Sequence, residues 1–293
     1  MAVSRFLAID LGDSSMKAAE FVSDGRESIR LVNFGFAPLG IDPSSEENRN
    51  SAITATLRKL LLERQFKARH VALTVSGQTV LTRFTKLPTA DEAKIRQMVR
   101  YEAEQNVPFP IEEVVWDHQV IGERSGAELA VVMVAIKKDI IEGFNHCVEE
   151  VELSLEIVDV APLAIYNAAR YNYEEESDSG CTLIVDIGAR TTNLIFVEAK
   201  KVFTRNVPIA GNTITQNICQ ELEISFAEAE AAKAREGFVG LGGAYEEPES
   251  EIAAKMSKII RNVMTRLHAE ISRSINFYKT QQGGKAPRCL LLA

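Results

Sequence analysis

Two short stretches of the sequence each place a carboxylate, a glycine and hydroxyl groups close together. The first, AIDLGDSSMKAAEF, begins at Ala8, and the second, IVDIGARTTNLIFV, begins at Ile184. In each, an apolar strand-like run ends in an aspartate, a glycine follows two residues later, and a second apolar run begins. Such residues form either an ordinary surface hairpin, since Asp and Gly favour tight turns, or a loop that holds phosphates and a metal ion.

The two stretches align without a gap, which indicates an internal repeat. The aligned pairs are Asp10 with Asp186, Gly12 with Gly188, and Ser15 with Thr191. Either motif alone is weak, but two such hairpins on similar domains can face each other across a cleft. Glycines let backbone N–H groups approach an anion closely, and carboxylates hold Mg²⁺, usually through water. The repeat therefore predicts a two-sided clamp for a polyphosphate, with Lys17 as a positive charge. It is not a P-loop, because GxxxxGK[ST] is missing.

Composition narrows the classes of partner. The net charge is −8 and the sequence contains four cysteines. A negative chain argues against a nucleic-acid partner held by bulk electrostatics. No apolar run approaches the ~20 residues of a membrane span, and the N-terminus lacks a secretory signal, so we expect a cytoplasmic protein without direct membrane insertion. The scattered cysteines favour buried thiols over a zinc site or disulfides.

The periodicity of the first half predicts three strands, a helix and further strands, with a helix-containing insertion. The expected elements are strands at 6–11, 16–23, 29–39, 70–76 and 80–88, a helix at 48–65, and then a helix at 89–106, strands at 114–122 and 129–137, a helix at 139–151, a strand at 155–160 and a helix at 161–171. The pattern of segment 88–160 predicts a small inserted subdomain.

The acidic stretch EEESDSG at 174–180 predicts a solvated loop and a domain boundary. After it, strand, turn and strand follow again, and we expect a long amphipathic helix near the end. The expected later elements are helices at 212–223, 226–236 and 249–282, a glycine-rich loop at 237–248 and a strand at 289–293.

The paired hairpins resemble those of the actin-like ATPase superfamily. Three stretches narrow the resemblance to the PilM family of type IV pilus assembly proteins, in the FtsA-like branch. They are EAEQNVPFPIEEVVWDHQVIG, AVVMVAIKKDIIEGFNHCVEEVELSLEIVDVAPLAIYNA and VDIGARTTNLIFVEAKKVFTRNVPIAGNTITQNI. The resemblance runs from about Phe6 to Ala293.

This resemblance implies an α/β, actin-like ATPase fold, in which duplicated ribonuclease H-like domains surround a nucleotide cleft, with an inserted FtsA/PilM-type subdomain. The implied domains are a first actin-like domain (IA) at 1–87 and 161–179, the inserted subdomain (1C) at 88–160, and a second actin-like domain (IIA/IIB) at 180–293. In the family, a glycine-rich turn and more helix follow the last strand, so we expect the chain to be truncated at its C-terminus.

The resemblance also implies that the cleft binds ATP with Mg²⁺. The implied nucleotide-binding residues are Asp10, Gly12, Asp13, Ser14, Ser15, Lys17, Asp186, Gly188, Thr191, Thr192, Asn193, Gly211, Glu230 and Lys233. Asp10 and Asp186 would hold the magnesium ion, through water. Glu230 and Lys233 fit the AExxK pattern that meets adenosine in this branch, although an exposed i,i+3 ion pair has the same spacing.

The family role is that of an adaptor. PilM-like proteins bind the N-terminal cytoplasmic tail of PilN, an inner-membrane protein, together with other proteins of the pilus platform. The resemblance thus implies a place at the inner membrane, held there through the partner, and a groove between the first domain and the inserted subdomain. Tyr101, Val107, Phe109 and Trp116 are candidates for that groove, although the sequence favours the core for each of them.

Two positions depart from the family pattern. Asp13 stands where relatives have a small or hydroxyl residue, and a carboxylate beside phosphates predicts weaker ATP binding unless magnesium or Lys17 offsets it. Ala161 stands near the point where hydrolysing relatives carry a carboxylate that orients water. No general base or other catalytic residue is evident, so we expect slow hydrolysis or none.

Other functions remain open at this point. The chain could be a kinase or ATPase of the superfamily, a membrane-bound filament protein of FtsA type, or a component of a related type II secretion platform. A further alternative is that the hairpins are only structural and the cleft binds nothing.

Overall fold

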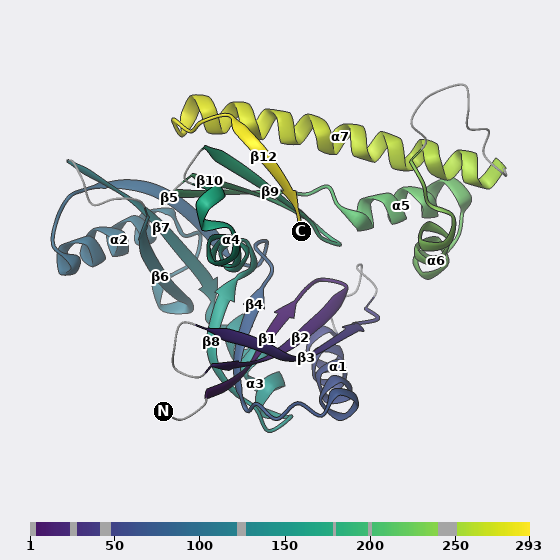
Figure 1. The fold of residues 1–293 in the computed structure, drawn as a ribbon, viewed down its shortest axis with the longest axis horizontal. Helices are drawn as coiled ribbons and strands as arrows, with labels where there is room; N and C mark the ends of the chain where they lie inside the picture. The colour runs from purple at the N-terminus through teal and green to yellow at the C-terminus, as the bar shows by residue number, and fades with distance from the viewer. Residues whose placement is uncertain are drawn as a thin grey trace. The chain divides into compact units, whose positions relative to one another are not determined.

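The computed structural model describes residues 4–23, 28–41, 48–121, 127–177, 180–198, 201–239 and 251–293 (Figure 1). The chain divides into two compact units. Unit 1 comprises Met1–Ser179 and Val197–Phe203, and unit 2 comprises Gly180–Phe196 and Thr204–Ala293. Among the helices of the described residues, none has the length and hydropathy needed to cross a membrane.

Unit 1 contains a five-stranded sheet in the order β3-β2-β1-β4-β8. Its strands are β1 (Ser4–Leu11), β2 (Ser15–Ser23), β3 (Ile29–Pro38), β4 (His70–Val75) and β8 (Ser154–Val160). The first three form the expected antiparallel meander, while β4 and β8 run parallel to β1. Leu7, Ile9 and Leu11 of β1 are all buried, because alternate side chains along a strand lie on the same face.

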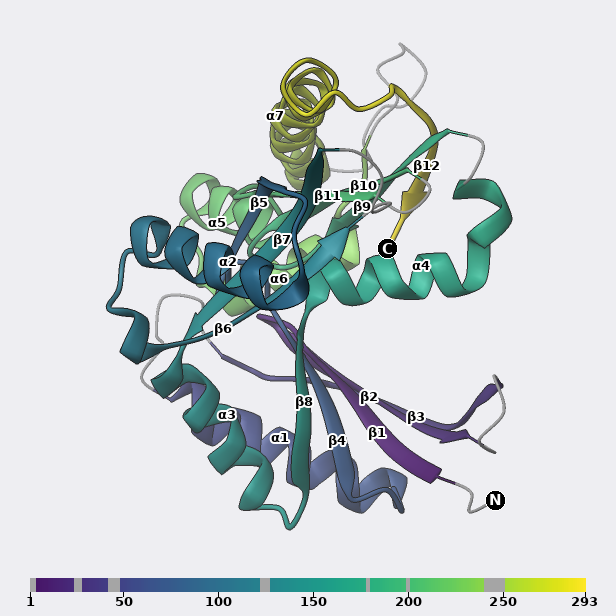
Figure 2. The same ribbon diagram turned by 90° about the vertical axis from the view of Figure 1, so that its left-hand side faces the viewer.

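Helices cover both faces of this sheet. α1 (Arg49–Arg64) and α3 (Lys138–Glu149) pack side by side on one face, and α4 (Ala161–Ser177) contacts β4 and β8 from the other (Figure 2). α1 buries Ile53, Leu57 and Leu60, whose spacing of three to four residues places them on one side of a helix. Ser14, in the β1–β2 turn, is exposed outside this core.

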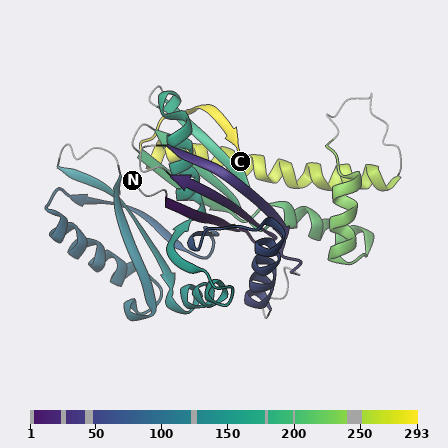
Figure 3. The same cartoon turned by 60° about the horizontal axis from the view of Figure 1, so that its bottom comes forward.

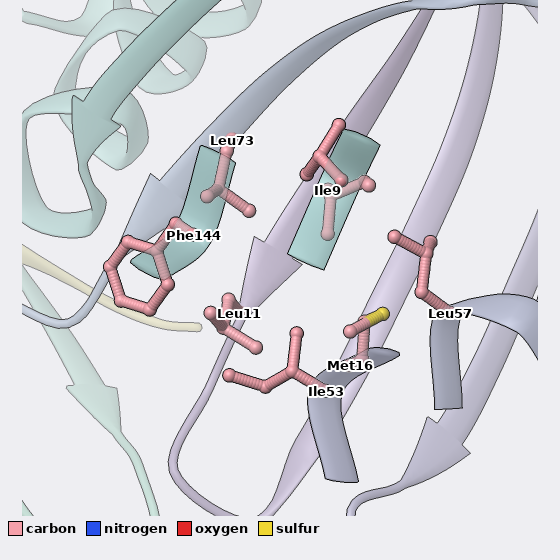
Figure 4. A pocket seen from close by; sticks show the side chains of 8 residues that line it. Ile9, Leu11, Met16, Ile53, Leu57, Leu73 and Phe144 are labelled. Atoms are coloured by element: carbon pink, nitrogen blue, oxygen red, sulfur yellow. The ribbon is translucent and has the colours of Figure 1, made fainter. Parts of the chain in front are cut away.

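A cavity of about 10 Å³ lies within the core between the sheet and the two helices. Figure 4 shows the apolar side chains that converge on it from β1, β2, β4, α1 and α3. A water molecule in so small a space needs polar partners, and all eight lining residues are apolar. The cavity is therefore a packing gap and not a ligand site.

Unit 1 also contains a three-stranded sheet in the order β5-β7-β6, which we call the three-stranded layer (Figure 3). It comprises β5 (Leu81–Pro88), β6 (Val114–Ile121) and β7 (Glu128–Lys137), with the short 3-10 helix η1 (Ile111–Glu113) before β6. α2 (Glu92–Asn106) covers one face with Ile95, Val99 and Ala103. The Asp91 side chain caps α2 by accepting a hydrogen bond from the Lys94 N–H at 2.9 Å, which satisfies one of the unpaired donors of the first turn.

The strand pairings give this layer bounds that differ from the expected 88–160. β5 precedes residue 88 in the sequence and pairs with β7 along its whole length. α3 and β8 lie within 88–160, yet both belong to the five-stranded sheet and its core. We therefore propose 81–137 as the inserted subdomain.

Unit 2 repeats part of this topology. Its sheet has the order β11-β10-β9-β12, and β12 pairs in parallel with β9 as β4 does with β1. The strands are β9 (Cys181–Ile187), β10 (Thr192–Glu198), β11 (Lys201–Val207) and β12 (Pro287–Leu292). The order β3-β2-β1-β4 of unit 1 thus recurs strand by strand, as a duplicated domain requires.

Between β11 and β12, the described residues form α5 (Gly211–Leu222), α6 (Phe226–Glu236) and α7 (Glu251–Gln281). Ile218, Ala229 and Met256, one from each helix, form a shared core. Toward the other end of α7, the ring of Tyr278 stacks on Phe196 of β10 at 4.4 Å between centroids. These contacts hold the start of α5 beside the β9–β10 turn.

One expected loop is partly helical. α4 continues to Ser177, with non-helical dihedral angles only at Tyr173, so the first four residues of EEESDSG extend a helix and the prediction of a loop there is wrong. Of the glycine-rich stretch expected at 237–248, residues 240–248 lie outside the described residues.

Candidate functional site

The turn between β1 and β2 closes on Gly12. The Gly12 N–H donates to the Ser15 carbonyl at 3.0 Å. A Cβ atom added to Gly12 would also lie 3.0 Å from that oxygen, so only glycine allows this close approach without a shift of the backbone. The Ser14 carbonyl accepts the Leu39 N–H at 2.9 Å, and the Ser14 side chain is exposed.

Asp10 lies at the carboxyl end of β1, opposite Lys17 in the strand register. The Lys17 ammonium donates to Oδ2 of Asp10 at 2.9 Å, and the Thr74 hydroxyl donates to Oδ1 at 3.0 Å. The Lys17 and Asp10 side chains remain 55% and 41% exposed. An exposed ion pair is weak, so a stronger ligand can compete for both groups.

Arg49 and Asp13 form a second ion pair at the same turn, which the sequence analysis did not anticipate. Arg49 Nη2 lies 3.6 Å from Asp13 Oδ1 and donates to the Gly12 carbonyl at 3.2 Å. Asp13 therefore pairs with Arg49 from α1, whereas Lys17 pairs with Asp10. No local pattern could have indicated this pair, because 37 residues separate Arg49 from Gly12.

The β9–β10 turn has the same geometry as the first. The Gly188 N–H donates to the Thr191 carbonyl at 3.0 Å, and a Cβ atom on Gly188 would lie 2.9 Å from that oxygen. Asn193 Nδ2 donates to Asp186 Oδ2 at 2.8 Å, across the same seven-residue span that joins Lys17 to Asp10. The Asn206 amide in turn donates to Asn193 Oδ1 at 2.9 Å. The internal repeat thus extends to the contacts of the side chains.

The β9–β10 turn is tied to the start of α5. The Gly211 N–H donates to the Gly188 carbonyl at 3.1 Å. The Thr192 hydroxyl donates to the Ile209 carbonyl at 2.7 Å, and Thr192 is fully buried. Thr192 therefore anchors the β9–β10 turn through a buried hydrogen bond, while Gly188 itself is exposed. Two residues of the site predicted from sequence, Gly188 and Gly211, meet through their backbones.

Glu230 and Lys233 do more than form an exposed ion pair. Lys233 Nζ donates to Glu230 Oε2 at 2.7 Å, to the Thr215 hydroxyl at 2.8 Å and to the Gly211 carbonyl at 3.3 Å. The Thr215 hydroxyl also lies 2.6 Å from Glu230 Oε2. Partial burial opposes ionisation of Glu230, but the hydrogen bonds from Lys233 and Thr215 and the Lys233 charge outweigh it and lower the pKa of Glu230. Thr215 was not predicted from sequence.

Asp159 is a carboxylate that the sequence analysis overlooked near Ala161. The register places Asp159 of β8 beside Thr74 of β4, and Thr74 beside Asp10 of β1. Partners in register share one face of the sheet, so the three side chains form a row. Burial raises the pKa of Asp159, although a hydrogen bond from the Val160 N–H opposes the shift. A raised carboxyl pKa in the row of Asp10 could have been expected only once the register was known.

The donors present fit magnesium in part. The strand before each turn ends in one carboxylate, Asp10 or Asp186, and Mg²⁺ usually takes one or two carboxylates together with phosphate oxygens and water. Among the described residues, no group of three or more His, Cys, Asp or Glu side chains could hold a metal ion alone. Either carboxylate would need further ligands, such as the phosphates of a nucleotide, to complete a magnesium site.

The four residues named for the partner groove divide into two pairs. Val107 is buried and Trp116 packs against the core of the three-stranded sheet. Tyr101 and Phe109 are 62% and 42% exposed. The Lys137 ammonium lies 4.6 Å from the centre of the Phe109 ring, a cation–π contact at the surface.

Comparison with known proteins agrees with this geometry. Residues 8–292 match the family described as "Type IV pilus assembly protein PilM". The cell division protein FtsA of Bacillus subtilis (strain 168) is 25% identical over 276 residues, which cover 84% of this chain and 60% of FtsA. FtsA of Agrobacterium fabrum (strain C58) is 26% identical over 176 residues, which cover 57% of this chain and 39% of that protein. The chain thus spans at most about 60% of the length of these relatives.

A solved "PilM-PilN type IV pilus biogenesis complex" contains a chain with the same fold. It aligns with a TM-score of 0.81 and 24% identity, over 98% of this chain and 80% of that chain. The prediction of an actin-like ATPase fold with an inserted subdomain of the PilM type is confirmed. Since the family match takes in residues 8–292, nearly the whole sequence, the chain belongs to the PilM family of type IV pilus assembly proteins.

Proposed function

We propose that this chain is an ATP-binding adaptor of a type IV pilus assembly platform. The observation that carries the nucleotide half of the proposal is the repeated turn. Gly12 and Gly188 close their turns with the same hydrogen bond, and Asp10 and Asp186 each contact the residue seven positions later. A packing role alone would not require a carboxylate with the same seven-residue contact to recur at matching positions of two domains.

In this proposal the two turns act on one nucleotide. Backbone N–H groups of glycine-containing turns bind anions, and Lys17 would leave Asp10 to contact a phosphate. Asp10 and Asp186 would then hold a hydrated magnesium ion, which offsets the phosphate charge. The exchange is plausible energetically, because the exposed Lys17–Asp10 pair is worth only about 0.2–1 kcal/mol.

We assign the adenosine side to the cluster of Gly211, Thr215, Glu230 and Lys233. Its hydrogen bonds fix the Glu230 carboxylate and the Lys233 ammonium within unit 2. Carboxylate and amine groups held in this way suit the hydroxyl groups of a ribose. Gly211 leaves the start of α5 open, since it has no side chain to occupy this space.

Hydrolysis is a separate question, and Asp159 is the residue on which it depends. A carboxylate with a raised pKa in the row of Asp10 has the character of a group that orients water. We retain the expectation of slow turnover or none, and a steady-state phosphate-release assay tests it. Robust turnover that Asp159→Asn abolishes would contradict the expectation and make this chain an ATPase.

The adaptor half of the proposal rests on family membership and on the solved complex, whose title names PilN as the partner of PilM. We propose that a PilN-like membrane protein binds this chain through its cytoplasmic tail and so holds it at the inner membrane. Tyr101, Phe109 and Val115 expose apolar surface on the three-stranded layer. Aromatic residues of this kind are frequent anchors in interfaces.

Calorimetric titration of Mg-ATP tests the nucleotide site. We expect binding to the wild type and its loss in Asp10→Ala and in Asp186→Ala. Asp117→Ala is the matched control, because the Asp117 side chain is 89% exposed on β6 and lies outside both turns. If both turn variants still bind Mg-ATP, then the nucleotide binds at another site.

Fluorescence anisotropy with a peptide of the PilN-like tail tests the partner surface. Phe109→Ala and Tyr101→Ala should each weaken binding by about tenfold, a loss typical of an interface anchor. Leu62→Ala is the control, since Leu62 is 74% exposed on α1. Equal affinities in all four proteins would move the partner site away from the three-stranded layer.

A further inference from the structure

Arg49 occupies a position that the stability of α1 does not explain. It is the first residue of the helix, whose first turn contains no acidic residue. The helix dipole disfavours a cation at this end by a few tenths of a kcal/mol or more. The preceding Asn48 side chain makes no capping hydrogen bond. The Arg49 side chain contacts the β1–β2 turn, at Gly12 and Asp13.

The turn and its surroundings hold two matched pairs of charges. Asp10 pairs with Lys17, and Asp13 pairs with Arg49. The outer pair, Lys17 and Asp10, is 55% and 41% exposed, whereas the inner pair, Arg49 and Asp13, is only 25% and 16% exposed. Charges screened less by water interact more strongly. A ligand can therefore separate the outer pair at low cost, but the inner pair resists separation.

We propose that Arg49 is a positioning residue that neutralises Asp13 and thereby sets the affinity of the first turn for a phosphate chain. The inference rests on the proposed nucleotide site. Without Arg49, the Asp13 carboxylate would stand uncompensated beside Gly12, whose turn offers the backbone donors. A fixed negative charge there would repel every phosphate that approaches.

The converse holds for Asp13. Asp13 neutralises the positive charge of Arg49, which would otherwise attract a phosphate. Replacing Asp13 by Asn removes the charge but keeps the shape, and leaves Arg49 at the turn through its hydrogen bond to the Gly12 carbonyl. The first turn would then carry net positive charge, and it would bind phosphate chains more tightly than the wild type does.

The test is a double-mutant cycle measured by titration with Mg-ATP and with magnesium tripolyphosphate. The variants are Asp13→Asn, Arg49→Gln, both together, and the conservative Arg49→Lys. Arg58→Gln on the exposed side of α1 is the matched control. Asp10→Ala is included as the variant that removes the site itself. Thermal unfolding of each protein verifies that it is folded.

We expect Arg49→Gln to weaken both ligands by about tenfold and Asp13→Asn to tighten both by several-fold, as coupling between neighbouring charges commonly does. The double variant should bind better than Arg49→Gln alone, and Arg49→Lys should retain most of the affinity. A loss due only to misfolding of the turn would not be rescued by Asp13→Asn. The gain in Asp13→Asn should also diminish with added salt.

Three results would overturn the inference, and they separate it from the proposed function. In the first, the wild type binds the ligands, Asp10→Ala does not, and Asp13→Asn has the same affinity as the wild type. The nucleotide site is then supported and the proposed role of Arg49 is refuted. If Arg49→Gln and the double variant bind equally weakly, Arg49 acts on the fold and not through Asp13. If no protein binds either ligand, Asp13→Asn included, both the inference and the nucleotide site fail.

Discussion

The Asp159 side chain lies at a position where stability and function favour different residues. Its carboxylate lies where burial disfavours the charge, although a neutral side chain would fit the sheet at lower cost. Such groups are frequent in functional sites. Asp159 is in register with Thr74 and Asp10. This position gives a reason for a partly buried carboxylate, which packing alone does not.

Asp159→Asn should therefore stabilise the protein, and the gain should depend on pH. The folded-state pKa lies above the ordinary value, so the wild type loses stability as the pH rises through that raised pKa. At low pH the carboxyl is protonated in both states and the penalty vanishes. Urea unfolding above the raised pKa, at about pH 8, and below the ordinary pKa, at about pH 3, should show a larger difference between the proteins at the higher pH. A difference that is constant with pH would contradict the assignment.

Residues of the site were predictable where the signal was local. Asp10 and Gly12 follow from a strand that ends in a tight turn, and Asp186 and Gly188 repeat it. Arg49 and Thr215 were not predictable, because their partners lie 37 and 15 residues away in sequence. Asp159 required the register of three strands, which no periodicity gives.

At the scale of elements, the two turns need glycine for a steric reason. A Cβ atom on Gly188 would approach the Thr191 carbonyl to 2.9 Å. Gly188→Ala should therefore cost about 1–3 kcal/mol, the range for forced overpacking, and should also weaken Mg-ATP binding. Chemical unfolding measures the first effect, with Ser14→Ala as a control because that side chain is exposed. An unchanged unfolding midpoint would mean that the turn adapts without cost.

The edge where β2 meets α1 depends on one buried carboxylate. Glu20 is 2% exposed, and its Oε1 accepts the N–H groups of Lys67 at 2.8 Å and Ala68 at 2.6 Å. The Arg5 guanidinium lies 3.3 Å away. This carboxylate fixes the segment that leads from α1 into β4, and so the position of Thr74 beside Asp10.

Glu20→Ala should cost about 3 kcal/mol, because it leaves two buried donors and a charge without their acceptor. Glu20→Gln keeps an oxygen for the N–H groups and should cost less. Glu63→Ala removes an exposed ion pair on α1 and should change stability by less than about 0.5 kcal/mol. Equal unfolding midpoints for Glu20→Ala and Glu63→Ala would refute this role.

Most elements were predictable from periodicity, and the exceptions have physical causes. The bounds 88–160 stay a prediction, and the proposed bounds 81–137 differ from them because β8 pairs in the five-stranded sheet and α3 packs in its core. The sheet to which a strand belongs depends on the strand with which it pairs, and the residues of one strand do not specify that partner.

At the scale of the whole chain, the buried thiols give each unit its own reporter. The four cysteines, all among the described residues, form no disulfide. Cys147 of unit 1 and Cys181 of unit 2 are each 1% exposed, while Cys219 and Cys289 are partly exposed. Burial raises the pKa of Cys147, which lowers its thiolate fraction and its reactivity.

We expect a thiol reagent to label Cys219 and Cys289 first, and Cys147 and Cys181 only when their units unfold. In a Cys219→Ser/Cys289→Ser variant, labelling across a urea series followed by mass spectrometry gives one midpoint for each unit. Mg-ATP should raise both midpoints if both turns hold the nucleotide. Labelling of Cys147 in native buffer as fast as a small thiol would contradict its burial.

The parallel pairing of β9 with β12 has a consequence for synthesis of the chain on the ribosome. Leu183 pairs with Leu290, and the whole of α5, α6 and α7 lies between them. The edge of β9 that faces β12 must therefore keep its hydrogen-bonding groups unpaired until β12 has been made. In unit 1, β4 reaches β1 after β2, β3 and α1. Since distant pairings form slowly, unit 1 should complete its central pairing first, and the nascent chain should be most prone to aggregate while that edge of β9 is still unpaired.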